Sequence, residues 1–114
     1  LKPLIKIDAQ VNFNQINLDL YQQIDSLQPW GIGNDFPVFW TPQVRVLQQR
    51  VVGKQHLKLT LMQLGQKPRL AAIAWRWGEY YPLPELIDVA YKLKQNVWQQ
   101  QQTVQLELIG ARAC

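Results

Sequence analysis

The chain has 114 residues, a mass of 13.3 kDa, 47% hydrophobic residues and a formal net charge of +4. This length allows one domain with a real hydrophobic core and excludes a second large domain. No apolar run approaches the roughly 20 residues that cross a bilayer, and no secretory signal is recognisable, so we expect no membrane association. The chain begins with Leu1 instead of Met, which we interpret as a piece of a longer protein whose active site could lie elsewhere.

Cysteine and histidine are too scarce for most catalytic sites. The single Cys114 is the last residue, so neither an intrachain disulfide nor a cysteine-based zinc site can form, and we expect a reducing, cytoplasmic location. The single His56 has no neighbouring nucleophile, and the acidic residues are scattered instead of converging. We therefore expect this chain to contain no catalytic residue and no metal site.

The positive charge is concentrated in one segment. Residues 44–76 contain seven Lys and Arg and no Asp or Glu, whereas residues 1–43 contain two Lys and four Asp. Such segregation favours a surface that faces a polyanion. The alternative is a solvated basic face that keeps the protein soluble.

In the first third of the chain we predict one short strand and one helix. Residues 4–7 are apolar and β-branched, so we predict a short edge strand, followed by a connection over residues 8–15. Asn17 is a predicted N-cap of a helix of about 11 residues, whose apolar stripe is spaced every three positions and ends before Pro29. We predict core packing for the residues of this stripe, which are Leu18, Tyr21, Ile24 and Leu27.

Glycine and proline then make residues 29–37 a predicted loop. Beyond it the period changes to two, and we predict strands over residues 38–52, 56–64, 69–75, 86–93 and 103–109. Connections are expected over residues 76–84 and 96–102. The predicted fold class is mainly β, a five-stranded OB-fold Greek-key barrel preceded by a short N-terminal strand and a connecting helix. An SH3-like barrel or an open α+β sheet is the alternative.

Cations and aromatic rings occur together in the predicted barrel. Single-stranded nucleic acid needs cations along its phosphates and flat rings on which its bases stack. Trp75, Trp77, Tyr80 and Tyr81 lie near the end of the third predicted strand, although core packing is the commoner role of tryptophan. The residues that we predict to bind nucleic acid are Arg45, Arg50, Lys54, His56, Lys58, Arg69, Arg76, Trp77, Tyr80, Lys92 and Lys94.

Three stretches together resemble the C-terminal region of the RecJ family, single-stranded-DNA-specific 5′-to-3′ exonucleases of the DHH phosphoesterase superfamily. They are Leu-Gln-Pro-Trp-Gly-Ile-Gly-Asn at 27–34, Val-Gly-Lys-Gln-His-Leu-Lys-Leu at 52–59, and Asp-Val-Ala-Tyr-Lys-Leu at 88–93 with Asn96, Trp98, Gln105 and Leu106. Trp30 departs from the family's usual Phe. The chain contains no Asp-His-His motif.

The resemblance implies that residues 38–114 are an OB domain that holds single-stranded DNA for a nuclease core lying before Leu1. Residues 1–37 would be the end of the preceding domain, the connecting helix and the loop. The core would use Mn²⁺ or Mg²⁺ and act in DNA repair and recombination. Expected partners are single-stranded DNA, the rest of the nuclease chain, and the single-stranded-DNA-binding protein or other repair proteins.

A second hypothesis is a docking module that contacts the nuclease core or another protein and never touches DNA. Its support is the aromatic group of Trp30, Phe36, Phe39 and Trp40, which could form a contact between domains. A third is an OB module for RNA, because no residue pattern here identifies recognition of a 2′-hydroxyl group.

Overall fold

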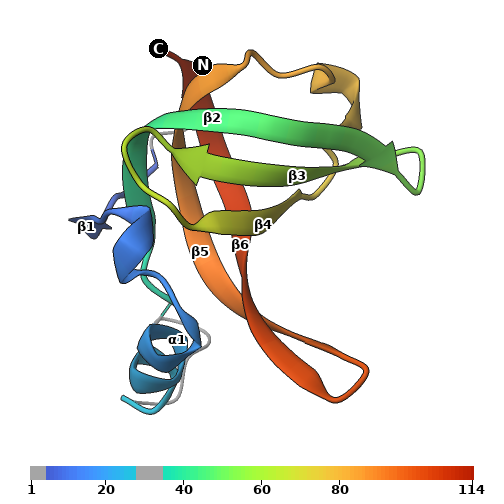
Figure 1. Ribbon diagram of the computed structural model, residues 1–114. Helices are drawn as coiled ribbons and strands as arrows, with labels where there is room; N and C mark the ends of the chain where they lie inside the picture. Colours follow the sequence, from blue (N-terminus) through green and yellow to red (C-terminus); the bar gives the residue numbers. More distant parts are fainter. Residues whose placement is uncertain (1–4, 28–34) are drawn as a thin grey trace.

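Alternating apolar and polar residues form five long strands in the computed structural model, which describes residues 5–27 and 35–114 (Figure 1). The strands are β2 (Phe39–Val52), β3 (His56–Gln63), β4 (Arg69–Ala74), β5 (Leu86–Trp98) and β6 (Gln101–Ala113). They pair in the order β2-β3-β4-β6-β5, and a further pairing of β2 with β5 closes the barrel. Only β4 and β6 run parallel among these pairs. The predicted OB-fold class is therefore confirmed.

The alternation along β3 shows how the core forms. Leu57, Leu59 and Leu61 point inward and are at most 2% exposed, whereas Lys58 between them is exposed. Six apolar residues of β5 and β6 also belong to this core. They are Ile87, Val89, Tyr91, Leu93, Leu106 and Leu108.

β2 bends because its pairing register shifts twice. One shift, against β5, lies between Thr41 and Val44, and the other, against β3, lies between Val46 and Gln48. Pro42 lies within the first shift, where the regular hydrogen bonding between the strands is interrupted. The N–H that proline lacks is therefore not needed there. The strand predicted over residues 38–52 is thus confirmed, and its bends let β2 pair with β5 first and β3 later.

The N-terminal strand lies later than predicted. Instead of residues 4–7, the strand is β1 (Ala9–Gln10), which pairs in parallel with the start of β2. Asp8 fixes this position, since its N–H donates to the Val38 carbonyl and its carboxylate accepts from the Val38 N–H, each at 2.8 Å. The short helix η1 (Phe13–Gln15) follows, and Phe13 is fully buried against Tyr91 in the barrel core.

The connecting helix is shorter than predicted. α1 (Leu18–Asp25) has eight residues, and the Asn17 side chain accepts the Leu20 N–H at 2.8 Å, as expected of an N-cap. Ile24 joins the core, but Leu27 lies beyond the helix and is 72% exposed, so the predicted stripe is wrong at its last position. Pro29 and Trp30 lie outside the described residues. Of the helices described, none is long and apolar enough to cross a membrane.

The last hairpin is longer than predicted. β5 continues to Trp98 and β6 begins at Gln101, so Gln99 and Gln100 alone form the turn, both with positive φ. The predicted connection over residues 96–102 is therefore wrong. The hairpin projects well beyond the barrel, at the lower end of β5 and β6 in Figure 1.

Candidate nucleic-acid interface

A row of side chains crosses the outer face of the barrel on neighbouring strands. Arg50 on β2 faces Lys58 on β3, and the row continues through Ile73 and Glu107 to Lys92 on β5. Like charges directly opposite one another destabilise a sheet. Arg50 and Lys58 belong to neither of the two ion pairs found between described residues. Such an unneutralised pair of cations is typical of a surface that meets a polyanion.

Lys58 also lies between two hollows in this face. The first has a volume of about 340 Å³ and extends over β2, β3 and β4. The second, of about 300 Å³, lies between Lys58 and the projecting β5–β6 hairpin. The first is lined by Gln48, Gln49, Arg50, Lys58, Leu59, Thr60 and Ala71, and the second by Lys58, Asn96, Trp98, Gln101 and Thr103.

Trp75 follows β4 and lies on the same side. Its side chain is held by residues of three other strands, although 47% of the residue remains exposed. The indole N–H donates to Glu107 Oε2 on β6 at 2.9 Å, and Lys94 Nζ on β5 lies 5.3 Å from the ring centroid. The His56 ring of β3 is nearly perpendicular to the indole, with 5.0 Å between centroids. A large aromatic surface is thus fixed beside the cations.

His56 also shapes the chain after β4. Its Nδ1 accepts the backbone N–H of Arg76 at 2.9 Å, so the neutral ring carries its proton on Nε2. Arg76 has a φ of 65°, in the left-handed region that non-glycine residues rarely adopt. His56 therefore stabilises the turn that directs Trp75 toward β6.

The segment between β4 and β5 is attached to the β2–β3 turn. Gly78, at the start of η2 (Gly78–Tyr80), donates its N–H to the Gln55 carbonyl at 2.8 Å. A Cβ at position 78 would lie 2.8 Å from the same oxygen, so only glycine permits this approach. Trp77 is half-buried against the core, and Tyr80 packs edge-on to it while remaining 57% exposed.

The structure brings only some of the predicted binding residues together. Arg50, His56, Lys58, Lys92 and Lys94 share the outer face formed by β2, β3, β6 and β5. The other charged candidates lie further along their strands or in turns. Arg45 forms an ion pair with Glu85 at 2.9 Å, Arg69 faces Met62, Lys54 lies in the exposed β2–β3 turn, and Arg76 is exposed after β4.

Three residues of this face were absent from the predicted binding set: Trp75, Trp98 and Glu107. Trp98 is 69% exposed at the hairpin tip and lines the second hollow. One signal was available, because tryptophan is uncommon at a polar turn such as residues 96–102. Glu107 carried no such signal, since its partner Trp75 is 32 positions away in the sequence.

Tyr91 on β5 has a displaced pKa and is linked to Thr41 on β2. Burial raises the pKa of the Tyr91 hydroxyl far above its usual range, and this hydroxyl hydrogen-bonds Thr41 Oγ1 at 2.7 Å. Across residues 5–27 and 35–114, no three His, Cys, Asp or Glu side chains are grouped to hold a metal ion. These residues therefore do not fit the Mn²⁺ or Mg²⁺ that the resemblance implies for a nuclease core.

Comparisons with known proteins agree with this architecture. The chain is 30% identical over 109 residues to the single-stranded-DNA-specific exonuclease RecJ of Dickeya dadantii, and 32% identical over 111 residues to that of Haemophilus influenzae. It aligns over 93% of its own length in both cases but spans only 19% of either relative.

A solved structure shows the same fold. The crystal structure of RecJ from Thermus thermophilus in complex with Mn²⁺ matches 83% of this chain with a TM-score of 0.64 and 24% sequence identity, and the match covers 14% of that protein. The RecJ OB domain family matches residues 7–110, nearly the whole sequence. The chain therefore belongs to the RecJ OB domain family.

Proposed function

We propose that this chain is the single-stranded-DNA-binding OB domain of a RecJ-like 5′-to-3′ exonuclease. It holds the strand for a catalytic core, with its Mn²⁺ or Mg²⁺, in the part of the longer protein that this chain does not span. We also propose residues 1–37 as the connection to that core and residues 38–114 as the binding domain. The parent enzyme would act in DNA repair and recombination in the cytoplasm, with repair proteins as further partners.

The observation that carries this proposal is the unneutralised pair of Arg50 and Lys58 beside the two hollows. Phosphates of a single strand would neutralise these cations, and the exposed rings of Trp75 and Trp98 are available for stacking. In an OB fold, the second and third barrel strands and the neighbouring loops bind oligonucleotides. Here these strands are β3 and β4, which contribute Lys58 and lead into Trp75.

The docking hypothesis loses part of its support. Phe39 is buried in the core, Phe36 stacks on Tyr21 at 5.6 Å between centroids, and Arg112 covers Trp40 at 4.9 Å. These three rings therefore already have partners within the chain. Trp30, the fourth ring, lies outside the described residues.

Charge reversal at one position tests the proposal. We expect Lys58→Glu to weaken binding of a fluorescein-labelled oligothymidylate of about 12 nucleotides by about tenfold, measured by anisotropy at low salt. The new carboxylate would repel phosphates, yet it would face Arg50 and relieve the like-charge pair. A loss of affinity would therefore not result from unfolding.

Lys67→Glu is the matched control, since it changes the net charge equally. Lys67 is exposed in the turn after β3, at the opposite end of that strand from His56. We expect at most a twofold effect there. Equal losses from the two variants would mean that only net charge matters, and no binding by the wild-type chain would favour the docking hypothesis. Tighter binding of an oligouridylate of the same length would indicate RNA.

A further inference from the structure

Glu107 is an acidic residue on a surface that we propose to bind phosphates. It is the only acidic residue of β3, β4 and β6, and it lies in the same cross-strand row as Lys58 and Lys92. A carboxylate there repels a polyanion. Its structural contact explains the position, because Oε2 accepts the indole N–H of Trp75 at 2.9 Å.

The surroundings of Trp75 restrict its orientation further. His56 lies nearly perpendicular to the indole, and the His56 Nδ1 bond to Arg76 fixes the backbone directly after Trp75. Nevertheless, 47% of Trp75 remains exposed. A ring that is both fixed and exposed is suited to stacking, because binding then immobilises few additional groups.

We infer that Trp75 is a stacking platform for one unpaired nucleobase and that Glu107 is the positioning residue that holds it. This inference rests on the proposed function and specifies that a nucleobase binds at Trp75. Lys94 Nζ, 5.3 Å from the ring centroid, covers the indole when no strand is bound. On binding, the base replaces this ammonium group over the ring, and Lys94 pairs with the adjacent phosphate.

Two probes separate stacking from phosphate binding. One is a labelled oligothymidylate of about 12 nucleotides, and the other is an abasic strand with the same number of phosphates. We expect Trp75→Ala to weaken binding of the oligothymidylate by about tenfold and of the abasic strand by less than about twofold. Equal losses on both probes would overturn the stacking role.

Two substitutions of Glu107 test its positioning role. Glu107→Gln keeps an oxygen that can accept the indole N–H and removes the charge, so we expect wild-type or slightly tighter binding. Glu107→Ala removes the charge and the acceptor, so we expect about a fivefold loss on the oligothymidylate and none on the abasic strand. If Glu107 acted by repulsion alone, both variants would bind more tightly, and that result would overturn the inference.

The indole N–H resonance of Trp75, assigned by its loss in Trp75→Ala, gives a readout independent of affinity. We expect Glu107→Ala to shift this resonance toward that of a solvent-exposed indole, and Glu107→Gln to shift it little. A wild-type chain that bound neither probe would instead contradict the proposed function itself, together with this inference.

Discussion

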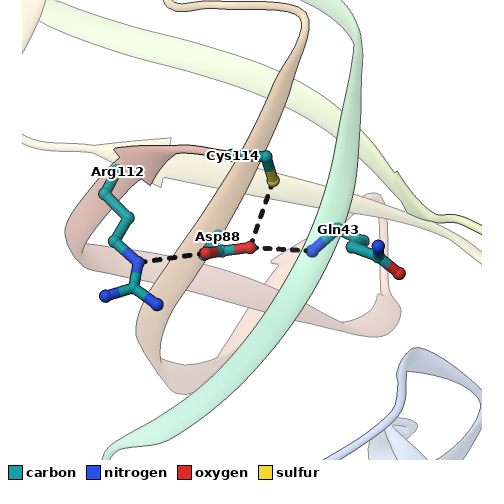
Figure 2. Close-up of polar contacts among 4 residues, drawn as sticks. All are labelled: Gln43, Asp88, Arg112 and Cys114. Carbon is teal, nitrogen blue, oxygen red and sulfur yellow. Dashed lines mark hydrogen bonds and ion pairs between the residues drawn. The ribbon is translucent and has the colours of Figure 1, made fainter.

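Asp88 shows how one residue fixes the shape of the barrel. Its carboxylate accepts the Gln43 backbone N–H and the Arg112 Nε–H, each at 3.0 Å, and the Cys114 thiol lies at 3.2 Å (Figure 2). Gln43 has a φ of 55° at the first register shift of β2. Asp88 therefore stabilises the bend that brings β2 from β5 to β3.

Removing this charge should destabilise the fold in a pH-dependent way. The hydrogen bond from Gln43, aided by Arg112, lowers the pKa of Asp88 even though burial opposes this shift. A lowered pKa stabilises the folded state above the ordinary value near 4, and this stabilisation is lost as the pH falls through the folded value. We expect Asp88→Asn to reduce the free energy of unfolding by about 1–2 kcal/mol at neutral pH.

Urea unfolding from neutral pH down to about pH 2 measures this effect. The difference between wild type and Asp88→Asn should shrink toward zero at the acidic end. Asn can still accept the Gln43 N–H, so the bend itself should persist in the variant. A difference in the free energy of unfolding that stayed constant with pH would show that Asp88 stabilises the fold through the shape of its side chain and not through its charge.

One part of the candidate site follows from the alternation of side chains along a strand. Because side chains alternate along a strand, the sequence places Lys58 outward between buried leucines, and the structure agrees. The contact between Trp75 and Glu107 depends on the register of β4 against β6, which pair in parallel through only two residue pairs. No local pattern specifies such a register, so this part of the site could not be predicted.

The full length of the β5–β6 hairpin also could not be predicted from the sequence. Beyond Val104 the two strands have no buried face, and the residues from Asn96 to Thr103 are all exposed. Without a buried face the alternation of apolar residues disappears, although the backbone still pairs up to Trp98 and Gln101. Sequence reasoning therefore ended β5 too early, began β6 too late and placed Trp98 in a loop.

Shortening the hairpin should weaken DNA binding without weakening the barrel. Asn96 and Thr103 face each other, so an Asn-Gly turn can replace residues 97–102. This change removes Trp98 and Gln101 from the second hollow. We expect about a tenfold loss of affinity for single-stranded oligothymidylate in the anisotropy assay.

The thermal unfolding midpoint should stay within a few degrees of wild type, because Val97 and Trp98 are 60% and 69% exposed. Trp98→Ala is the milder companion variant and should show most of the loss if stacking dominates. Full affinity in the shortened chain would exclude the hairpin from the interface.

For the whole molecule, the distribution of charge matters more than its sum. The formal net charge is only +4, but residues 44–76 contain seven cations and no acid. Folding neutralises part of this segment, since Arg45 pairs with Glu85, and leaves Arg50 facing Lys58. β5 adds Lys92 and Lys94 from outside the segment. Sequence counting predicts the excess charge, whereas its assembly on one face requires the barrel.

This assembly predicts the salt dependence of binding. If Arg50, Lys58, Lys92 and Lys94 each neutralise about one phosphate, the logarithm of the association constant should fall with the logarithm of salt concentration with a slope near −3. Anisotropy titrations between low and physiological salt give this slope directly. Lys58→Glu should make it shallower by about one, because one phosphate contact is lost, and Lys67→Glu should leave it unchanged. A wild-type slope near zero would mean that phosphates do not lie on these cations, whatever the affinity.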